Sequence, residues 1–141
     1  MKTTKILVQK SETGLSEDNK AKLKSLEIYK DKKHFKFSNG LVDLAYELGK
    51  NIEEVCKLAN CELPKIEAMY NKYNTLRVDY HFTSPVQKIV ETLIDSLIYV
   101  TEDKSEMICE CCGKSCDIEI TEKNNNYINA CEKCFDRKNR D

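Results

Sequence analysis

The chain has 141 residues, 40% of them hydrophobic and 33% charged, and a formal net charge of -1. This length predicts one domain with a small appended module, and the near-neutral charge gives no general indication of nucleic acid or acidic substrates as partners. No apolar run approaches the roughly 18 to 20 residues of a membrane span, and the run at residues 6–8 is too short for a signal peptide. We therefore predict a cytoplasmic protein.

Residues 1–36 are predicted to form a basic N-terminal segment. They hold ten Lys and five acidic residues, a local balance of +5. Such a segment favours contact with a polyanion, and a solvated face with a mobile basic arm is the alternative. The pattern predicts a short strand over residues 5–9 and a helix over residues 17–29, with Ser16 as its N-cap.

Residues 37–82 are predicted to form a small helical domain. An apolar-rich helix is expected over residues 41–48, and Gly49 favours its end because glycine readily adopts left-handed backbone. A second short helix is expected to start at Asn51, which has the spacing of a capping box. A third is expected over residues 63–73, with a proline in its first turn.

The run NIEEVCKLANCELPKIEAMYNKY, residues 51–73, has the apolar spacing of a helix-turn-helix. Asn60 lies where a residue with positive φ must turn the chain. The run resembles the opening segment of the lac-repressor family of DNA-binding regulators, with Cys56 at a small inward position and Asn60 where that family has a turn glycine. The resemblance implies a DNA-binding transcription regulator.

The outward face of the expected third helix carries few groups that suit DNA. Lys65, Asn71 and Lys72 are the candidate DNA contacts, whereas Glu62 and Glu67 would repel phosphates. The alternative, in which the same pattern only packs a small helical domain, stays open.

Residues 83–101 are predicted to form a long amphipathic helix that begins at Ser84 and Pro85. Apolar residues recur at three-and-four spacing over about four turns. The stripe either closes the core, which the small size of the domain favours, or forms a dimer seam. It consists of Val86, Ile89, Val90, Leu93, Ile94, Leu97 and Ile98.

Residues 107–141 are predicted to form a zinc module with one structural ion. Two Cys-x2-Cys pairs, separated by eighteen residues, have the spacing of a tetrahedral four-thiolate site, and Gly113 permits the tight turn after the first pair. A disulfide framework is the alternative for a chain with eight cysteines, but nothing else in the chain indicates secretion. The predicted ligands are Cys109, Cys112, Cys131 and Cys134.

Residues 108–136 resemble the N-terminal zinc-binding domain of the ClpX unfoldase. They share its cysteine spacing, the Gly-Lys-Ser after the first pair and the Tyr-Ile before the second. The resemblance implies a treble clef, with a zinc ribbon as the alternative, and a hairpin that pairs Ile118 and Ile120 with Tyr127 and Ile128. It also implies a module that binds partner proteins, self-associates and does no chemistry.

The other four cysteines have no assigned role. Cys111 and Cys116 are either bystander thiols or a redox sensor, which would need a low thiol pKa. Cys56 and Cys61 are predicted to lie in the core.

The sequence gives little indication of a catalytic site. The two histidines, His34 and His81, are isolated, and a four-sulfur zinc site leaves no position for an activated water. The sequence therefore predicts a mainly α, non-enzymatic, zinc-containing DNA-binding transcription regulator without a small-molecule substrate. The alternative is a protein-binding adaptor or inhibitor, of the kind phages and mobile elements encode, which docks on a host protein. A homodimer is compatible with both.

Overall fold

The computed structural model describes residues 2–7, 15–32, 35–72, 75–109, 113, 117–118 and 127–130. These residues form a mixed α/β fold, so the predicted mainly α fold class is wrong. No helix in these ranges is long and apolar enough to cross a bilayer. The elements in chain order are β1 (Lys2–Leu7), α1 (Glu17–Lys24), the 3-10 turns η2 (Glu27–Tyr29) and η3 (Asn39–Leu41), α2 (Val42–Ala59), β2 (Lys65–Lys72), β3 (Thr75–His81), α3 (Lys88–Ser105), β4 (Asp117–Ile118) and β5 (Tyr127–Ala130).

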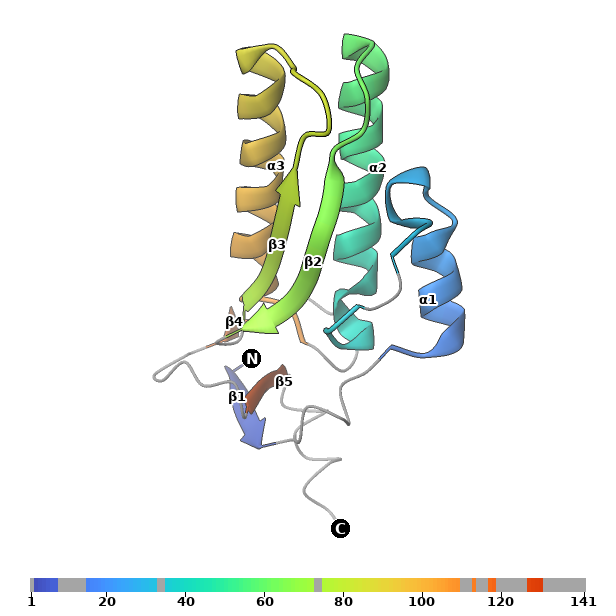
Figure 1. Ribbon diagram of the computed structural model, residues 1–141. Coiled ribbons are helices and arrows are strands. Elements are labelled where there is room, and N and C mark those ends of the chain that lie inside the picture. Colours follow the sequence, from blue (N-terminus) through green and yellow to red (C-terminus); the bar gives the residue numbers. More distant parts are fainter. Residues whose placement is uncertain are drawn as a thin grey trace.

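The main body consists of an antiparallel β2–β3 hairpin packed on two long helices. Figure 1 shows α2 and α3 side by side, with the hairpin lying lengthwise in front of them and α1 beside α2. The core lies between these layers. Its largest fully buried side chains are Tyr29, Phe37, Leu23, Leu41, Leu48, Ile52, Met69, Leu76, Ile94 and Val42.

The predicted helix-turn-helix is wrong because its third helix is the strand β2. Ile66 and Met69 are both buried, and their spacing of three suits one face of a helix. In a regular strand such residues would point to opposite faces. A register shift between Ile66 and Ala68 inserts one extra residue, and this bulge brings both apolar side chains to the core.

α2 is one continuous helix, so the predicted end at Gly49 is also wrong. Gly49 is buried in the middle of α2, where the Tyr29 ring packs against it. A Cβ atom on Gly49 would lie 2.6 Å from Tyr29 Cε2, and the Tyr29 hydroxyl donates a 2.7 Å hydrogen bond to the carbonyl of Ala45. Glycine at this position permits close packing of a ring rather than a left-handed turn.

Replacing Gly49 with Ala is expected to lower the free energy of unfolding, although alanine is the better helix former by about 1 kcal/mol. The new methyl group would overlap the Tyr29 ring, and overpacking of this kind costs about 1 to 3 kcal/mol. Denaturant unfolding measures the difference. The exposed neighbour Lys50, changed to Ala, is the control and should stay within about 0.5 kcal/mol of wild type. A Gly49→Ala protein at least as stable as wild type would contradict the close packing of the Tyr29 ring against Gly49.

Several local predictions are confirmed. α1 begins at Glu17, and the Ser16 hydroxyl accepts a hydrogen bond from the Asn19 amide at 3.3 Å. The expected helix over residues 17–29 is shorter, because α1 ends at Lys24 and a 3-10 turn follows. Asn60 has φ 54° and ψ 48°, the predicted left-handed turn, although it leads from α2 toward a strand.

Both edges of the hairpin are partly covered. On one side, the Lys36 backbone pairs with β2 through hydrogen bonds of 3.0 Å to Met69 and Asn71. On the other side, α3 supplies side-chain acceptors: Ser105 Oγ lies 2.8 Å from the Leu76 amide. Glu102 of α3 likewise accepts a 3.0 Å hydrogen bond from the Val78 amide of β3. Because unpaired edges invite further strand pairing, this hairpin does not offer a simple docking edge for another strand.

Candidate metal centre and interhelical groove

The first predicted zinc ligand, Cys109, lies four residues after the end of α3. Cys109 is fully buried, and its carbonyl accepts a 2.8 Å hydrogen bond from the Gly113 amide. Gly113 has φ +80°, which glycine adopts without the strain that a Cβ would add. This hydrogen bond and the Gly113 backbone are compatible with the predicted Cys-x2-Cys-Gly knuckle, whose second ligand, Cys112, lies outside the described residues.

Gly113 packs against η3, which directly precedes α2. A Cβ atom on Gly113 would lie 3.0 Å from the carbonyl oxygen of Gly40, which belongs to η3. Cys131 and Cys134 lie outside the described residues, as do Cys111 and Cys116. Within the described ranges no group of three or more His, Cys, Asp or Glu side chains could hold a metal ion, so zinc binding stays a prediction.

The strands near the cysteine pairs are arranged differently from the expected hairpin. β1 lies between β4 and β5, parallel to β4 and antiparallel to β5. Ile118 pairs with Thr3 and Ile128 pairs with Ile6, while Ile120 lies outside the described residues. The direct pairing of residues 117–118 with 127–130 is therefore wrong, because the N-terminal strand occupies the space between them.

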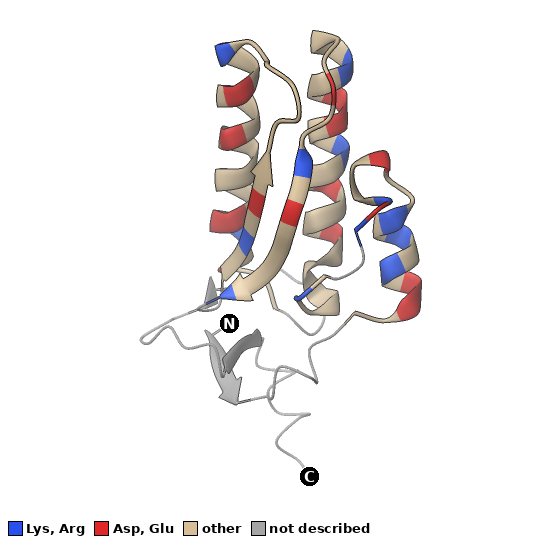
Figure 2. Ribbon diagram, viewed as in Figure 1, with Lys and Arg blue, Asp and Glu red and all other residues tan. Residues whose placement is uncertain are grey.

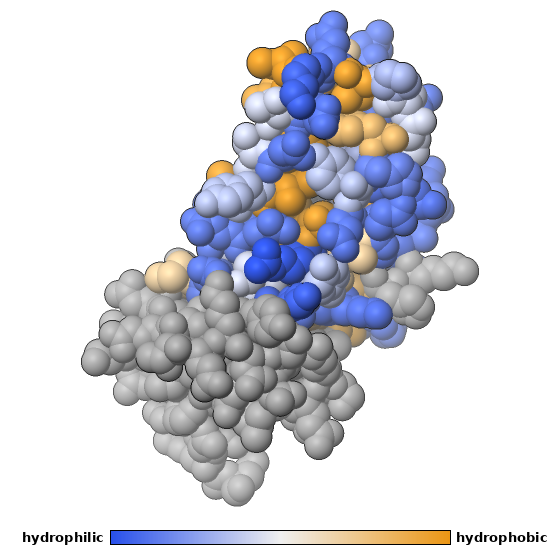
Figure 3. Space-filling model, turned by 60° about the vertical axis from the view of Figure 1, so that its left-hand side comes forward, coloured by the Kyte–Doolittle hydropathy of each residue, from blue (hydrophilic) through white to orange (hydrophobic). Residues whose placement is uncertain are grey.

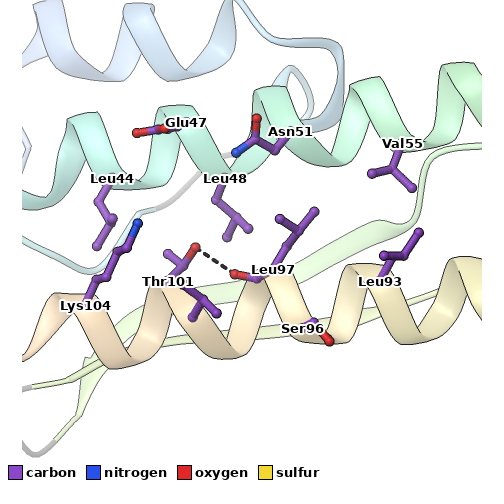
Figure 4. Close-up of a pocket in the computed structure, with 11 residues that line it drawn as sticks. Leu44, Glu47, Leu48, Asn51, Val55, Leu93, Ser96, Leu97, Thr101 and Lys104 are labelled. Atoms are coloured by element: carbon purple, nitrogen blue, oxygen red, sulfur yellow. Dashed lines mark hydrogen bonds between the residues drawn. The ribbon is translucent and has the colours of Figure 1, made fainter.

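α2 and α3 enclose a groove of about 280 Å³. Figure 4 shows Leu44, Leu48 and Val55 of α2 directed toward α3, where Leu48 faces Leu97 and Val55 faces Leu93. These five apolar side chains form most of its floor. We call this surface the interhelical groove; its lining is completed by Glu47, Asn51, Ser96, Val100, Thr101 and Lys104.

The polar groups of the interhelical groove do not converge on its floor. The Thr101 hydroxyl donates a 2.8 Å hydrogen bond to the Leu97 carbonyl within α3, so its polar atom is satisfied inside the helix. Glu47 on α2 and Lys104 on α3 supply opposite charges in its lining. This arrangement suits an apolar ligand surface with a polar border more than a small polar molecule, which needs several convergent donors and acceptors.

The apolar surface continues beyond the groove at one end. Leu58 lies three residues after Val55, and Ile89 lies four residues before Leu93, so each shares a helix face with a lining residue. Leu58 is 78% exposed and Ile89 is 63% exposed. Figure 3 shows apolar atoms at the surface near the end of the molecule where α2 ends and α3 begins.

The predicted stripe on α3 divides between two surfaces. The helix runs from Lys88 to Ser105, three residues past the predicted proline start, with Gln87 as its N-cap. Val90, Ile94 and Ile98 are buried in the core, as predicted. Leu93 is 49% exposed and lines the groove instead. The apolar stripe of α3 is too wide to be buried by a single neighbouring surface. This width was the feature of the sequence that could have indicated a second apolar surface.

The three candidate DNA contacts do not form a cluster. Lys65 and Lys72 are exposed at opposite ends of β2, about 23 Å apart at the usual rise of a strand. Asn71 is half-buried and pairs with Leu76. Between the two lysines in the sequence, a Glu67 carboxylate oxygen lies 2.5 Å from Nδ1 of His81. This surface therefore lacks the clustered cations of a phosphate-binding face.

The lysines of α1 and the following turn are largely engaged with carboxylates. Lys22 lies 2.6 Å from Asp43 and 5.1 Å from the centre of the Tyr46 ring. Lys20 and Lys30 contact glutamates three residues earlier. Figure 2 shows basic and acidic residues interspersed over the helices and the hairpin. Contact of the N-terminal segment with a polyanion stays a prediction.

Comparison with known proteins identifies no relative: no family model, curated protein or solved structure matches this chain.

Proposed function

We propose that this protein is a non-enzymatic, zinc-containing adaptor that binds a helix of a partner protein in the interhelical groove. The observation that carries the proposal is the open apolar floor between α2 and α3, where Leu93 and Val100 are 49% and 47% exposed. Exposed apolar surface bordered by polar residues is typical of protein-interaction sites. An apolar groove between two helices is a common receptor for an amphipathic helix.

The spacing of residues along α2 indicates the form of the ligand. Leu44, Leu48, Asn51, Val55 and Leu58 follow one another at intervals of four and three residues, the seam pattern of helices that pack side by side. The lined part, from Leu44 to Val55, is about 16 Å long, or about three helical turns. A partner helix of this length would place three or four apolar side chains in the groove.

Asn51 interrupts this apolar seam near its middle. A polar residue at such a position fixes the register of packed helices, because its amide needs a hydrogen-bonding partner once water is excluded. We therefore expect the partner helix to carry a polar side chain opposite Asn51. Glu47 and Lys104 further favour a partner with complementary charges beside its apolar face.

DNA binding through residues 63–73 is not proposed, because the recognition helix that supported it is absent: residues 65–72 form β2. A helix suits the major groove through its shape, and the regulator hypothesis depended on that element.

Replacing Leu93 or Val100 with Asp is expected to weaken partner binding at least about tenfold, because each change places a charge in the apolar contact. Tyr99→Asp is the matched control: Tyr99 belongs to the same helix, is 69% exposed and does not line the groove. Pull-downs from nuclease-treated extract of the native host, followed by affinity measurement with the purified partner, compare the three variants. Unchanged melting temperatures would show that the fold is intact.

Three outcomes would contradict the proposal. The partner could bind the Leu93 and Val100 variants as well as it binds the Tyr99 control. Nuclease treatment could abolish capture, which would indicate a nucleic-acid bridge. Finally, Lys65→Glu with Lys72→Glu could abolish capture while the groove variants retain it, which would move the binding surface to β2.

A further inference from the structure

The C-terminal end of α2 brings two cysteines together. Asn60 adopts left-handed backbone, and the Cys61 amide donates a 3.0 Å hydrogen bond to the Cys56 carbonyl. This six-to-one bond defines a Schellman motif, in which the side chains at the two bonded positions commonly contact each other. The backbone that ends the helix therefore also positions the two thiols.

The two thiols contact each other but differ in access to solvent. Cys56 is 1% exposed in the core, whereas Cys61 is half-buried at the surface of the core, and a hydrogen bond joins their side chains. Neither is a predicted zinc ligand, and neither lines the interhelical groove. The described zinc-ligand candidate, Cys109, comes after α3 in the chain, and α3 ends at the opposite end of the body from the end of α2 (Figure 1).

We propose that Cys56 and Cys61 form a reversible dithiol–disulfide site whose oxidant is a small disulfide such as glutathione disulfide. The Cys61 thiolate attacks one sulfur of the oxidant, forms a mixed disulfide and releases one glutathione thiolate. Cys56 then gives its proton to solvent and attacks the Cys61 sulfur, which releases the second glutathione. Two protein thiols are oxidised to one disulfide, and one glutathione disulfide is reduced to two glutathione molecules.

The environment of Cys56 determines the order of these steps. Burial, together with the Cys61 thiol, raises the pKa of Cys56 to about 12, so this thiol is almost fully protonated near neutral pH. Cys61 is therefore the entry point. Because the thiolate of Cys56 is needed for ring closure, closure should accelerate about tenfold per pH unit below this pKa. The resulting disulfide between Cys56 and Cys61 joins the last turn of α2 to the segment that leads into β2.

Tryptic mapping of the full-length protein tests the proposal. Cleavage after Lys50, Lys57 and Lys65 places the two cysteines in separate peptides, residues 51–57 and 58–65. After equilibration in glutathione buffers and acid quenching, the disulfide joins these peptides, and their combined mass is lower by two hydrogens. Excess reduced glutathione should return both peptides to the thiol form.

Two comparisons separate a site built by the fold from ordinary cysteine oxidation. Cys56→Ser should stop at a glutathione adduct on Cys61, whereas Cys61→Ser should leave Cys56 unmodified in the folded protein. The equilibrium constant for disulfide formation should be at least about tenfold larger in the folded chain than in the chain unfolded in urea, a difference of roughly 30 mV. A wild-type protein that accumulates only the Cys61 adduct, or equal constants in both states, would overturn the proposal.

Discussion

Replacing Cys131 with Ser is expected to release the zinc ion and unfold residues 107–141, while the α2, α3 and hairpin body stays folded. About 35 residues with few large apolar groups cannot build a sufficient core. Binding of zinc by four thiolates supplies roughly 10 to 16 kcal/mol, which is folding free energy for such a module. Metal analysis should find about one zinc per wild-type chain and almost none in the variant. Amide exchange should show loss of protection in the module and in β1, which pairs with β4 and β5, but not in the body.

Cys111→Ser is the matched control for this experiment. Cys111 lies beside the predicted ligand Cys112 but is predicted to be a bystander, so its replacement should leave zinc content unchanged. If Cys111→Ser releases the ion and Cys112→Ser does not, the ligand set is shifted by one residue. Less than half an equivalent of zinc in the wild-type protein would reject the metal site.

Predictions based on signals close together in the sequence are confirmed at several positions. Ser16 caps α1 because its hydroxyl meets an amide three residues later, and Asn60 turns the chain because its backbone tolerates positive φ. The helix from Lys88 to Ser105 follows from regular apolar spacing over several turns. Each of these features depends on residues within a few turns of one another.

Features that depend on distant residues were not predictable in the same way. Gly49 resembles a helix end until the packing of Tyr29, twenty positions earlier, is known. The spacing of Ile66 and Met69 fits a helix, and only pairing with β3 and its bulge reveals a strand. The pairing of β1 with both β4 and β5 joins segments more than a hundred residues apart.

The candidate sites show the same difference between signals that are local in the sequence and contacts that depend on the fold. Cysteine spacing alone predicts the metal site, because two Cys-x2-Cys pairs at this spacing can converge on one ion. The interhelical groove could not be located from the sequence, because its position depends on which face of α3 packs on the hairpin. Cys56 and Cys61 were predicted as core residues. Their contact is set by the Schellman motif that ends α2.

Ile94→Ala is expected to destabilise the protein far more than Leu93→Ala, although the two residues are adjacent in α3. Ile94 is fully buried between the helices and the hairpin, and removal of such a side chain costs about 2 to 5 kcal/mol. Leu93 is 49% exposed, so its truncation should cost less than about 1 kcal/mol. Thermal unfolding should show this difference, since each kcal/mol lowers the melting temperature of a chain this size by roughly 3 to 5 °C.

Light scattering of the same two variants tests the alternative in which the α3 stripe is a dimer seam. If two copies of the chain associate through Leu93, then Leu93→Ala should halve the mass in solution while the protein stays folded. If the exposed side of the stripe instead receives a partner helix, then Leu93→Ala should leave the mass unchanged and weaken only partner binding. Equal losses of stability for Ile94→Ala and Leu93→Ala would contradict the division of the stripe between core and groove, because truncation costs depend on burial.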